Sequence, residues 1–389
     1  MTDAAFMRQA LRLARSGCGT TSPNPMVGAV LVQLGKIIGR GWHQRAGGPH
    51  AEIEALRDAR QRGHRARGAT LYVTLEPCCT HGRTPPCTEA IKAAGIKRVV
   101  VGATDPNPKH AGKGFAILKR AGIEVVTPAA APWSEECARL NEAFNHWIVH
   151  HAPFVTVKAA MTLDGKIATA AGESKWITGA EARAHGMKLR QGSDAILVGI
   201  NTILADDPSL TFRKQKAESG KQKENKLRRI VLDSLARTPL NAQIVSDEFA
   251  GLTTIVVSRR APKFRVAALA THVKVLIAPT SKSAVGNRQS AINLRWLLKK
   301  LGAENVTRLL VEGGGEVNAS FLLGGLAQRV AFFYAPKILG GRDSRTGVAG
   351  EGVKSLSDMI QLRDVEWRRL GEDLLLTARV GAPISDPAR

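Results

Sequence analysis

The sequence has few cysteines and no long hydrophobic run, and both shortages exclude classes of protein. Five cysteines in 389 residues, an odd number with three of them between positions 78 and 87, do not make a disulfide framework. They favour a reducing compartment and a metal or catalytic use. The N-terminal stretch carries Arg8, Arg12 and Arg15 and predicts neither a signal peptide nor a membrane anchor, and no later stretch has the length to span a bilayer. We expect a cytoplasmic protein with no membrane partner.

Acidic residues are also scarce, at 33 against 56 Lys and Arg, which gives a net charge of +23. Such an excess attracts polyanions and phosphorylated small molecules but says nothing about the fold. The densest basic tract, residues 213–229, holds eight basic and two acidic residues and no aromatic one. It therefore lacks a stacking platform for single-stranded nucleic acid, and we interpret it as a solvated loop.

Two nucleotide-binding loops are absent. No Gly-x-Gly-x-x-Gly motif follows the first strand of the second half, so a Rossmann domain is disfavoured. The stretch HAGKG at 110–114 lacks the Ser or Thr of a nucleotide-binding P-loop.

The length and the ordinary apolar content of 44% predict two globular domains, which we place at 1–150 and 151–389. Both halves read as α/β. In the first half a helix at 5–17 and two strands within 27–43 precede strands and helices that alternate to residue 129. This alternation predicts a mostly parallel sheet with its site at the strand ends. In the second half we expect strands that begin near 154, 194, 228, 253, 273, 307, 329 and 374, and helices at 180–191, 291–301 and 316–323.

The strongest chemical signal is His50-Ala51-Glu52 followed by Pro77-Cys78, a known pattern of zinc-dependent base deaminases. Such an enzyme needs zinc, because zinc lowers the pKa of bound water from 15.7 to ~7. Three protein ligands leave the fourth position open for that water, and a carboxylate that is not a ligand moves its proton. Glu52 is our candidate for that carboxylate.

The choice between the three clustered cysteines follows from local geometry. Cys78 and Cys79 are neighbours and cannot readily reach one metal together while Cys87 closes the site. Cys87 begins a predicted helix, where the helix dipole stabilises a thiolate. We therefore predict His50, Cys78 and Cys87 as ligands and leave Cys79 to packing or to contacts around the ligands, although eight residues separate the two cysteine ligands where the usual motif has two.

Eight further stretches resemble one family. TTSPNPMVGAV, GWHQRAGGPHAE, LEPCCTHGRTPPC and DPNPKHAGKG are similar to the deaminase half of the bacterial bifunctional riboflavin-biosynthesis deaminase/reductases. KAAMTLDGKIA, GESKWITG, ILVGINTILADDPSLT and LLVEGGG resemble the reductase half, in the family's order. The resemblance implies a cytidine-deaminase-like zinc domain and a dihydrofolate-reductase-like domain, with Zn²⁺ and NADPH as cofactors.

The resemblance also implies two steps on one phosphorylated pyrimidine. The first is hydrolytic deamination of 2,5-diamino-6-(5-phosphoribosylamino)pyrimidin-4-one, and the second is NADPH-dependent reduction of the ribosyl group to ribityl. We further expect a homo-oligomer that does not bind nucleic acid.

Carried over by position, the family's zinc and acid–base residues fall on His50, Cys78, Cys87 and Glu52, in agreement with the chemical argument. The implied deaminase substrate residues are Asn24, His43, His81, Arg83, Asp105 and Asn107. The implied NADP-binding residues are Ala160, Trp176, Thr202, Asp206, Ser234, Gly314, Gly315, Glu316, Val317, Asn318, Ala319 and Ser320. The implied reductase substrate residues are Lys158, Ser174, Arg190, Leu210, Arg213 and Glu312.

Several of these residues have simpler explanations. Asn24 lies between two prolines and suits a plain turn, and Arg83 suits a surface charge. Arg213 belongs equally well to the basic tract. Lys158, which we expect to position the opened ribose beside Asp206 and Glu312, would also suit a structural ion pair.

Two other functions remain as alternatives. A nucleic-acid or tRNA editing deaminase with an accessory binding domain shares the zinc motif and suits the basic charge, but has no need of the second half. A structural zinc protein would close the site with a fourth protein ligand such as Cys79.

Overall fold

The computed structural model describes residues 2–81, 85–129, 131–212, 226–279 and 292–383. The chain divides into two compact units, Met1–Ala152 and Pro153–Arg389. None of the five cysteines forms a disulfide. Among the described residues, no helix combines the length and the apolar character needed to cross a bilayer.

The first unit is a five-stranded sheet in the order β2-β1-β3-β4-β5. Its strands are β1 (Gly28–Gln33), β2 (Lys36–Trp42), β3 (Thr70–Val73), β4 (Arg98–Val101) and β5 (Glu124–Val126). Its helices are α1 (Asp3–Arg15), α2 (Ala51–Gln61), α3 (Cys87–Ala93), α4 (Lys113–Arg120), α5 (Ser134–Leu140) and α6 (Glu142–His150).

The sheet of this unit is mixed: β2, β3, β4 and β5 run in one direction, as a mostly parallel sheet requires, and β1 runs against them. β3, β4 and β5 run parallel, whereas β1 pairs antiparallel with both β2 and β3. β1 and β2 are joined by a short turn in which Leu34 and Gly35 both have positive φ. A connection this short joins only antiparallel strands, so β1 and β2 run in opposite directions.

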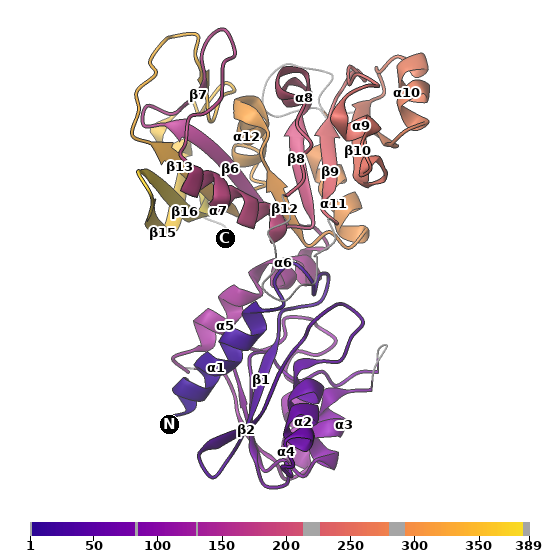
Figure 1. The fold of residues 1–389 in the computed structure, drawn as a ribbon, viewed down its shortest axis with the longest axis vertical. Coiled ribbons are helices and arrows are strands. Elements are labelled where there is room, and N and C mark those ends of the chain that lie inside the picture. Colours follow the sequence, from indigo (N-terminus) through magenta and orange to yellow (C-terminus); the bar gives the residue numbers. More distant parts are fainter. Residues whose placement is uncertain (1, 82–84, 130, 213–225, 280–291, 384–389) are drawn as a thin grey trace. The chain divides into compact units, whose positions relative to one another are not determined.

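Helices cover both faces of this sheet (Figure 1). Ala29 and Leu31 of β1 pack into a core with the alanines of α2, and Val30 and Val32 pack into a second core with α1. The period of two along a strand produces this division. α2 lies very close to β2, because a Cβ on Gly41 would meet the Ala51 carbonyl oxygen at 2.3 Å. This contact fixes the position of the N-terminus of α2.

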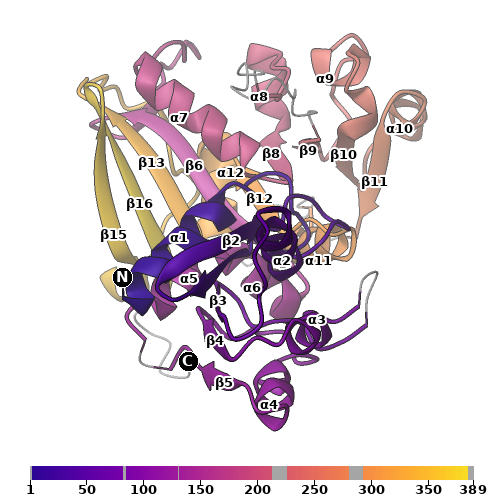
Figure 2. The ribbon, with the colours of Figure 1, turned by 60° about the horizontal axis from the view of Figure 1, so that its bottom comes forward.

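The second unit is built on a nine-stranded sheet in the order β11-β10-β9-β8-β12-β6-β13-β16-β15, which Figure 2 shows from edge to edge. Its strands are β6 (Phe154–Thr162), β8 (Ala195–Gly199), β9 (Arg228–Leu232), β10 (Thr253–Ser258), β11 (Lys274–Ala278), β12 (Arg308–Val311), β13 (Arg329–Ala335), β15 (Ile360–Leu370) and β16 (Asp373–Pro383). β7 (Lys166–Ala168) and β14 (Arg345–Thr346) form a separate pair. The helices are α7 (Ala180–Gln191), α8 (Ile200–Asp206), α9 (Gln243–Ser246), α10 (Lys263–Ala270), α11 (Leu294–Ala303) and α12 (Gly314–Leu322), with 3-10 turns at Ala250–Leu252 and Leu356–Asp358.

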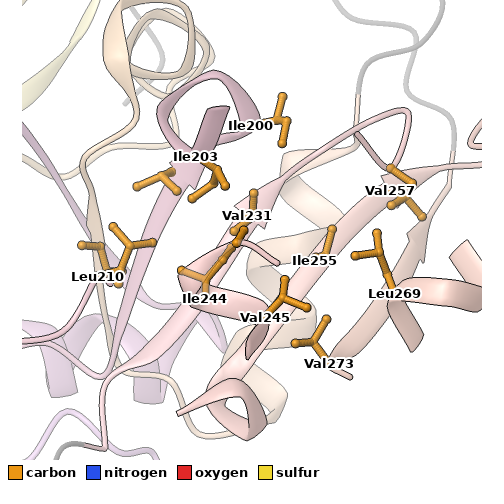
Figure 3. Close-up of a cluster of buried hydrophobic side chains, with 14 of the residues drawn as sticks. Ile200, Ile203, Leu210, Val231, Ile244, Val245, Ile255, Val257, Leu269 and Val273 are labelled. Atoms are coloured by element: carbon orange, nitrogen blue, oxygen red, sulfur yellow. The ribbon is translucent and has the colours of Figure 1, made fainter. Parts of the chain in front are cut away.

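Seven strands of the large sheet, from β11 to β13, are mutually parallel, and β16 and β15 add an antiparallel edge. A core of aliphatic side chains from α8, β9, α9, β10 and α10 fills one side of its parallel half (Figure 3). α7 packs on β13 and β16 through Ala182. The parallel strands place several loop and helix starts at one sheet edge, where ligand sites of open α/β sheets form.

One charged residue is part of this interior. Arg229 is fully buried, and its guanidinium donates to both carboxylate oxygens of Asp247 at 2.7 and 2.8 Å and to the Ser209 carbonyl at 3.0 Å. Because every direction of the guanidinium is paired, the charge is tolerated in the core. The Ser209 contact ties the loop after α8 to the sheet.

Candidate active sites

The first unit encloses a cavity of about 320 Å³ beside the N-terminus of α2. The predicted residues that line it are Asn24, His43, His50, Glu52, Cys78, Asp105 and Asn107. They arrive from the turn before β1, the end of β2, the start of α2 and the loops after β3 and β4. His81 is exposed and is not among the lining residues, and Arg83 lies outside the described residues.

Three potential metal ligands meet at this cavity. The Nδ1 atom of His50 lies 3.4 Å from the Cys78 sulfur and 3.3 Å from the Cys87 sulfur, and all three ligand atoms lie within 4.8 Å of one another. The Cys79 sulfur instead faces Nδ1 of His110 at 3.7 Å. One nitrogen and two sulfur donors suit tetrahedral zinc, and within the described part of the chain the cluster offers no fourth protein ligand.

The two thiols of this cluster differ in how readily they ionise. Hydrogen bonds from Cys87 and His50 lower the pKa of Cys78 to about 4 against the effect of burial, and the Cys87 backbone N–H also points at the Cys78 sulfur, at 3.3 Å. The same contact between the sulfurs raises the pKa of Cys87, so the two thiols share a proton in the absence of metal. A divalent cation would replace that proton.

Glu52 differs from the ligands in its surroundings. It follows His50 by two residues and is 3% exposed, and burial raises its pKa to about 6. A carboxyl group with a pKa near neutrality both accepts and returns a proton at physiological pH. The arrangement therefore supplies a proton carrier beside the metal cluster.

The polar wall of the cavity is preorganised. Nδ1 of His43 donates to the Pro49 carbonyl at 2.9 Å, so Nε2 is left to accept from the Asn24 amide at 3.1 Å. Burial lowers the pKa of His43, which is consistent with this neutral tautomer. Asn24 is thus more than a turn residue, because its side chain lies in the cavity and is held by His43.

Glu76 is a residue of this site that sequence reasoning missed. It is 4% exposed, and its carboxylate accepts from the backbone N–H groups of Asp105, Gly112 and Gly114 at 2.9 to 3.2 Å. The stretch DPNPKHAGKG therefore wraps around an internal carboxylate, which explains why it looks like a phosphate-binding loop without its Ser or Thr. An acidic residue directly after a buried strand was the available signal.

Part of the lining of the same cavity comes from α6, none of whose residues was selected from the sequence. Phe144, Trp147 and Ile148 line the cavity together with His110. No chemical motif marks α6; its only signal is a pair of aromatic residues three positions apart on one helix face.

The second unit has its own cavity, of about 330 Å³, at the carboxyl edge of β6, β8 and β12. The predicted residues that line it are Lys158, Ala160, Ser174, Trp176, Arg190, Thr202, Asp206, Leu210, Glu312, Gly314 and Asn318. Arg213 lies outside the described residues.

The other predicted cofactor residues do not line this cavity. On α12 only Gly314 and Asn318 do so, because residues four apart share a helix face. Glu316 and Ser320 are exposed, and Ala319 is buried in the protein interior. Gly315 instead packs against the backbone of Thr346, because a Cβ at this position would meet the Thr346 carbonyl oxygen at 2.3 Å. The Ser234 carbonyl accepts a hydrogen bond from the Ser258 hydroxyl. The resemblance implied that all of residues 314–320 bind NADP, but helix periodicity directs only one face of α12 toward the cavity.

Glu312 organises the charges of the second cavity. Its carboxylate contacts Lys158 at 3.3 Å and the guanidinium of Arg190 at 2.9 and 3.0 Å. Arg190 also donates to the Thr211 carbonyl at 3.0 Å, so this arginine is already occupied. Burial alone would raise the pKa of Glu312, but the two cations more than offset burial and lower it to about 2.

The mouth of this cavity carries residues that the sequence analysis did not select. Lys175 pairs with Asp206 at 3.4 Å. The Arg183 guanidinium lies over the Trp176 ring, 4.7 Å from its centre, and donates to the Thr178 carbonyl at 2.7 Å. Trp176 is 69% exposed, so Arg183 rather than burial holds its indole.

Two domain families match these two units. Residues 1–103 match the cytidine and deoxycytidylate deaminase zinc-binding region, and residues 153–376 match the RibD C-terminal domain. The riboflavin biosynthesis protein RibD of Actinobacillus pleuropneumoniae is 42% identical over 388 residues, which cover 99% of this chain and 97% of that protein. That of Aquifex aeolicus is 43% identical over 96% of this chain and 97% of its own length.

Solved structures agree over the same length. A diaminohydroxyphosphoribosylaminopyrimidine deaminase/5-amino-6-(5-phosphoribosylamino)uracil reductase from Thermotoga maritima has a TM-score of 0.81 at 35% identity. The RibD structure of Acinetobacter baumannii has a TM-score of 0.79 at 36% identity. Each covers 97% of this chain and 99% of the other.

Fold and sites together define a bifunctional enzyme with a cytidine-deaminase-like zinc domain and an NADPH-dependent, dihydrofolate-reductase-like domain. The chain belongs to the RibD family of riboflavin biosynthesis proteins. The predicted fold class, the two activities and the two cofactors are thereby confirmed. The editing-deaminase alternative is not favoured, because the relatives that match over the whole length are RibD proteins.

The charge network around Glu312 predicts a pH-dependent stability. Because its pKa is about 2 in the folded chain and 4.5 ordinarily, the carboxylate stabilises the fold above pH 4.5, and this contribution is lost as the pH falls toward 2. We expect Glu312→Gln to lower the free energy of unfolding by roughly 3 kcal/mol at pH 7. At pH 3 the difference from the wild type should shrink by more than half. Urea unfolding at both pH values measures the free energy of unfolding.

The exposed Glu372→Gln is the control and should change the free energy of unfolding by less than about 0.5 kcal/mol at either pH. An unchanged difference between wild type and Glu312→Gln from pH 7 to pH 3 would show that the carboxylate is not held ionised by Lys158 and Arg190.

Proposed function

We propose that this chain deaminates 2,5-diamino-6-(5-phosphoribosylamino)pyrimidin-4-one in residues 1–150 and then reduces the ribosyl group of the product in residues 151–389. The observation that carries the proposal is the pairing of two different sites in one chain. One combines a zinc donor set with a buried carboxylate of raised pKa, and the other combines a lysine with a buried carboxylate of lowered pKa.

For the first step His50, Cys78 and Cys87 would hold zinc, which would supply the Lewis acidity that makes hydroxide available at neutral pH. Glu52 takes the proton that water releases and delivers it to the departing amino group, so that ammonia leaves and a carbonyl replaces the amine. Asn24 and His43 bind the polar edge of the pyrimidine. Asp105 and Asn107, on the loop that Glu76 organises, complete this edge.

For the second step the cavity of the second unit would hold NADPH, which would supply the hydride that reduces the sugar carbon of the opened ribosylamine. Lys158 positions the opened ribose, and its contact with Glu312 holds the lysine side chain in the cavity wall. Trp176, Thr202, Asp206, Gly314 and Asn318 form the part of the wall that faces the cofactor. Ser174 and Leu210 contact the substrate, and Arg190 acts through Glu312 and the Thr211 loop instead of meeting a phosphate directly.

A coupled assay tests the proposed order. NADPH absorbance is followed after addition of the diaminopyrimidine ribosyl phosphate, with the native protein and with protein stripped of zinc by a chelator. We expect NADPH loss only in the presence of zinc, because deamination feeds reduction. NADPH loss without zinc would contradict the order, and ammonia release without NADPH loss would show that the second unit does not reduce this product.

Two variants should separate the activities reciprocally. Glu52→Gln should keep its zinc and lose roughly 100- to 10,000-fold in the kcat of deamination, yet still reduce the deaminated product. Lys158→Ala should deaminate normally and lose roughly 100-fold in NADPH oxidation. Each variant is the control for the other. Normal deamination by the first, or full NADPH turnover by the second, would remove the role assigned to that residue.

We further propose that the chain forms a homo-oligomer through β15. This edge strand is paired on one side by β16, and its residues from Gln361 to Arg369 are exposed on both faces, including Leu362, Val365 and Trp367. An edge of this length and apolar character favours pairing with a second copy. Sedimentation velocity should give an oligomer for the wild type and for Phe264→Lys, a control at another exposed apolar residue, and a monomer for Val365→Lys. A monomeric wild type would contradict the proposal.

A cytoplasmic location is proposed as well. It is supported by five free cysteines, two of which must stay reduced to bind zinc. Cell fractionation tests it, and recovery outside the cytoplasm would overturn it.

A further inference from the structure

The deaminase cavity has an aromatic wall to which no role has been assigned. Phe144 and Trp147 of α6 line the same cavity as His50 and Glu52. Both rings are half-buried, and their centres lie 6.3 Å apart with the planes tilted by 49°. Among the described residues that line the cavity, they are the only aromatic side chains apart from histidines. α6 also lies outside residues 1–103, the part that matches the deaminase zinc-binding region.

This wall is held in a fixed relation to the polar side of the site. Asn141, directly before α6, is 1% exposed, and its amide oxygen accepts from the Met26 backbone N–H at 2.8 Å. Its amide nitrogen donates to the Met26 carbonyl at 2.9 Å. Met26 belongs to the turn that carries Asn24. Two buried hydrogen bonds therefore join the start of α6 to the segment whose side chain contacts His43, and they resist independent movement of the two walls.

The chemistry of the cavity indicates what the aromatic wall could bind. A pyrimidine has a polar edge and two flat π faces, and the other predicted residues here offer nitrogen, oxygen or sulfur atoms that suit the edge or the metal. A flat face is bound by aromatic or apolar surface. Buried packing would account for apolar residues at this spacing, but packing residues are covered by protein, whereas both rings border open space in the cavity.

We infer that Phe144 and Trp147 are specificity-determining residues of the deamination, which bind a flat face of the pyrimidine while Asn24, His43 and Glu52 act on its edge. The inference rests on the proposed function of the first unit. It gives α6 a part in substrate binding, so the deaminase site extends beyond the segment shared with other zinc deaminases. Asn141 acts as a positioning residue for this wall.

Steady-state kinetics of the full chain test this role. Trp147→Ala and Phe144→Ala should each raise the KM for deamination roughly 10- to 100-fold, because a stacked base loses its face contact, with a smaller change in kcat. Trp147→Phe keeps an aromatic face and should recover most of the lost affinity. Val149→Ala, at an exposed position of α6 that does not line the cavity, is the matched control and should behave as the wild type. Zinc content and reduction of the supplied deaminated product should stay unchanged in all variants.

A direct binding measurement decides the case if an alanine variant is unstable. In a Glu52→Gln protein, in which turnover is blocked, titration with the diaminopyrimidine ribosyl phosphate should quench tryptophan fluorescence. Most of this quench should be lost in the double variant Glu52→Gln/Trp147→Phe, even though that protein still contains the five other tryptophans. Unchanged KM values in both alanine variants, or a quench that survives Trp147→Phe, would overturn the inference. Failure of the wild type to deaminate this compound would instead overturn the proposed function.

Discussion

Both sites depend on whether a cation balances the charge of an enclosed carboxylate. Within the described part of the chain Glu52 lies among sulfur and imidazole groups with no arginine or lysine partner, and burial raises its pKa to about 6. Glu312 is equally enclosed, but Lys158 and Arg190 contact it and its pKa falls to about 2. The same side chain is therefore a proton carrier in one unit and a fixed anion in the other. The rest of each site is arranged around this difference.

The scaffold serves these two carboxylates through close backbone contacts. α2 carries both His50 and Glu52, and its approach to β2 requires that Gly41 have no side chain. Glu76, at the end of β3, accepts three backbone N–H groups of the loop after β4 and so fixes Asp105 in the cavity wall. In the second unit Glu312 directly follows β12, and Arg229 anchors the neighbouring loop through Ser209. Parallel strand ends supply the positions, and buried hydrogen bonds hold them.

Residues with distinctive chemistry were predictable from the sequence, and residues defined by shape were not. The His-x-Glu and Pro-Cys patterns identified three donors that the fold brings within 4.8 Å, because metal chemistry restricts both residue type and spacing. The same approach missed Phe144 and Trp147, since aromatic residues at helical spacing are common in any core. It also treated residues 314–320 as one group, whereas helix periodicity directs only Gly314 and Asn318 toward the cavity. Arg190 was predicted only as a substrate residue, because a sequence does not reveal that Glu312 contacts its guanidinium.

The sequence by itself determined the order of the two domains and the family and predicted the zinc donors and the acid–base residue, because each depends on residue identity along the chain. Tertiary structure decided that β1 pairs with β3, that Cys79 faces His110, that Glu76 shapes a loop and that α6 lines the deaminase cavity. These features arise from contacts between segments far apart in the chain. Their energies depend on distance and burial, which no local pattern of residues encodes.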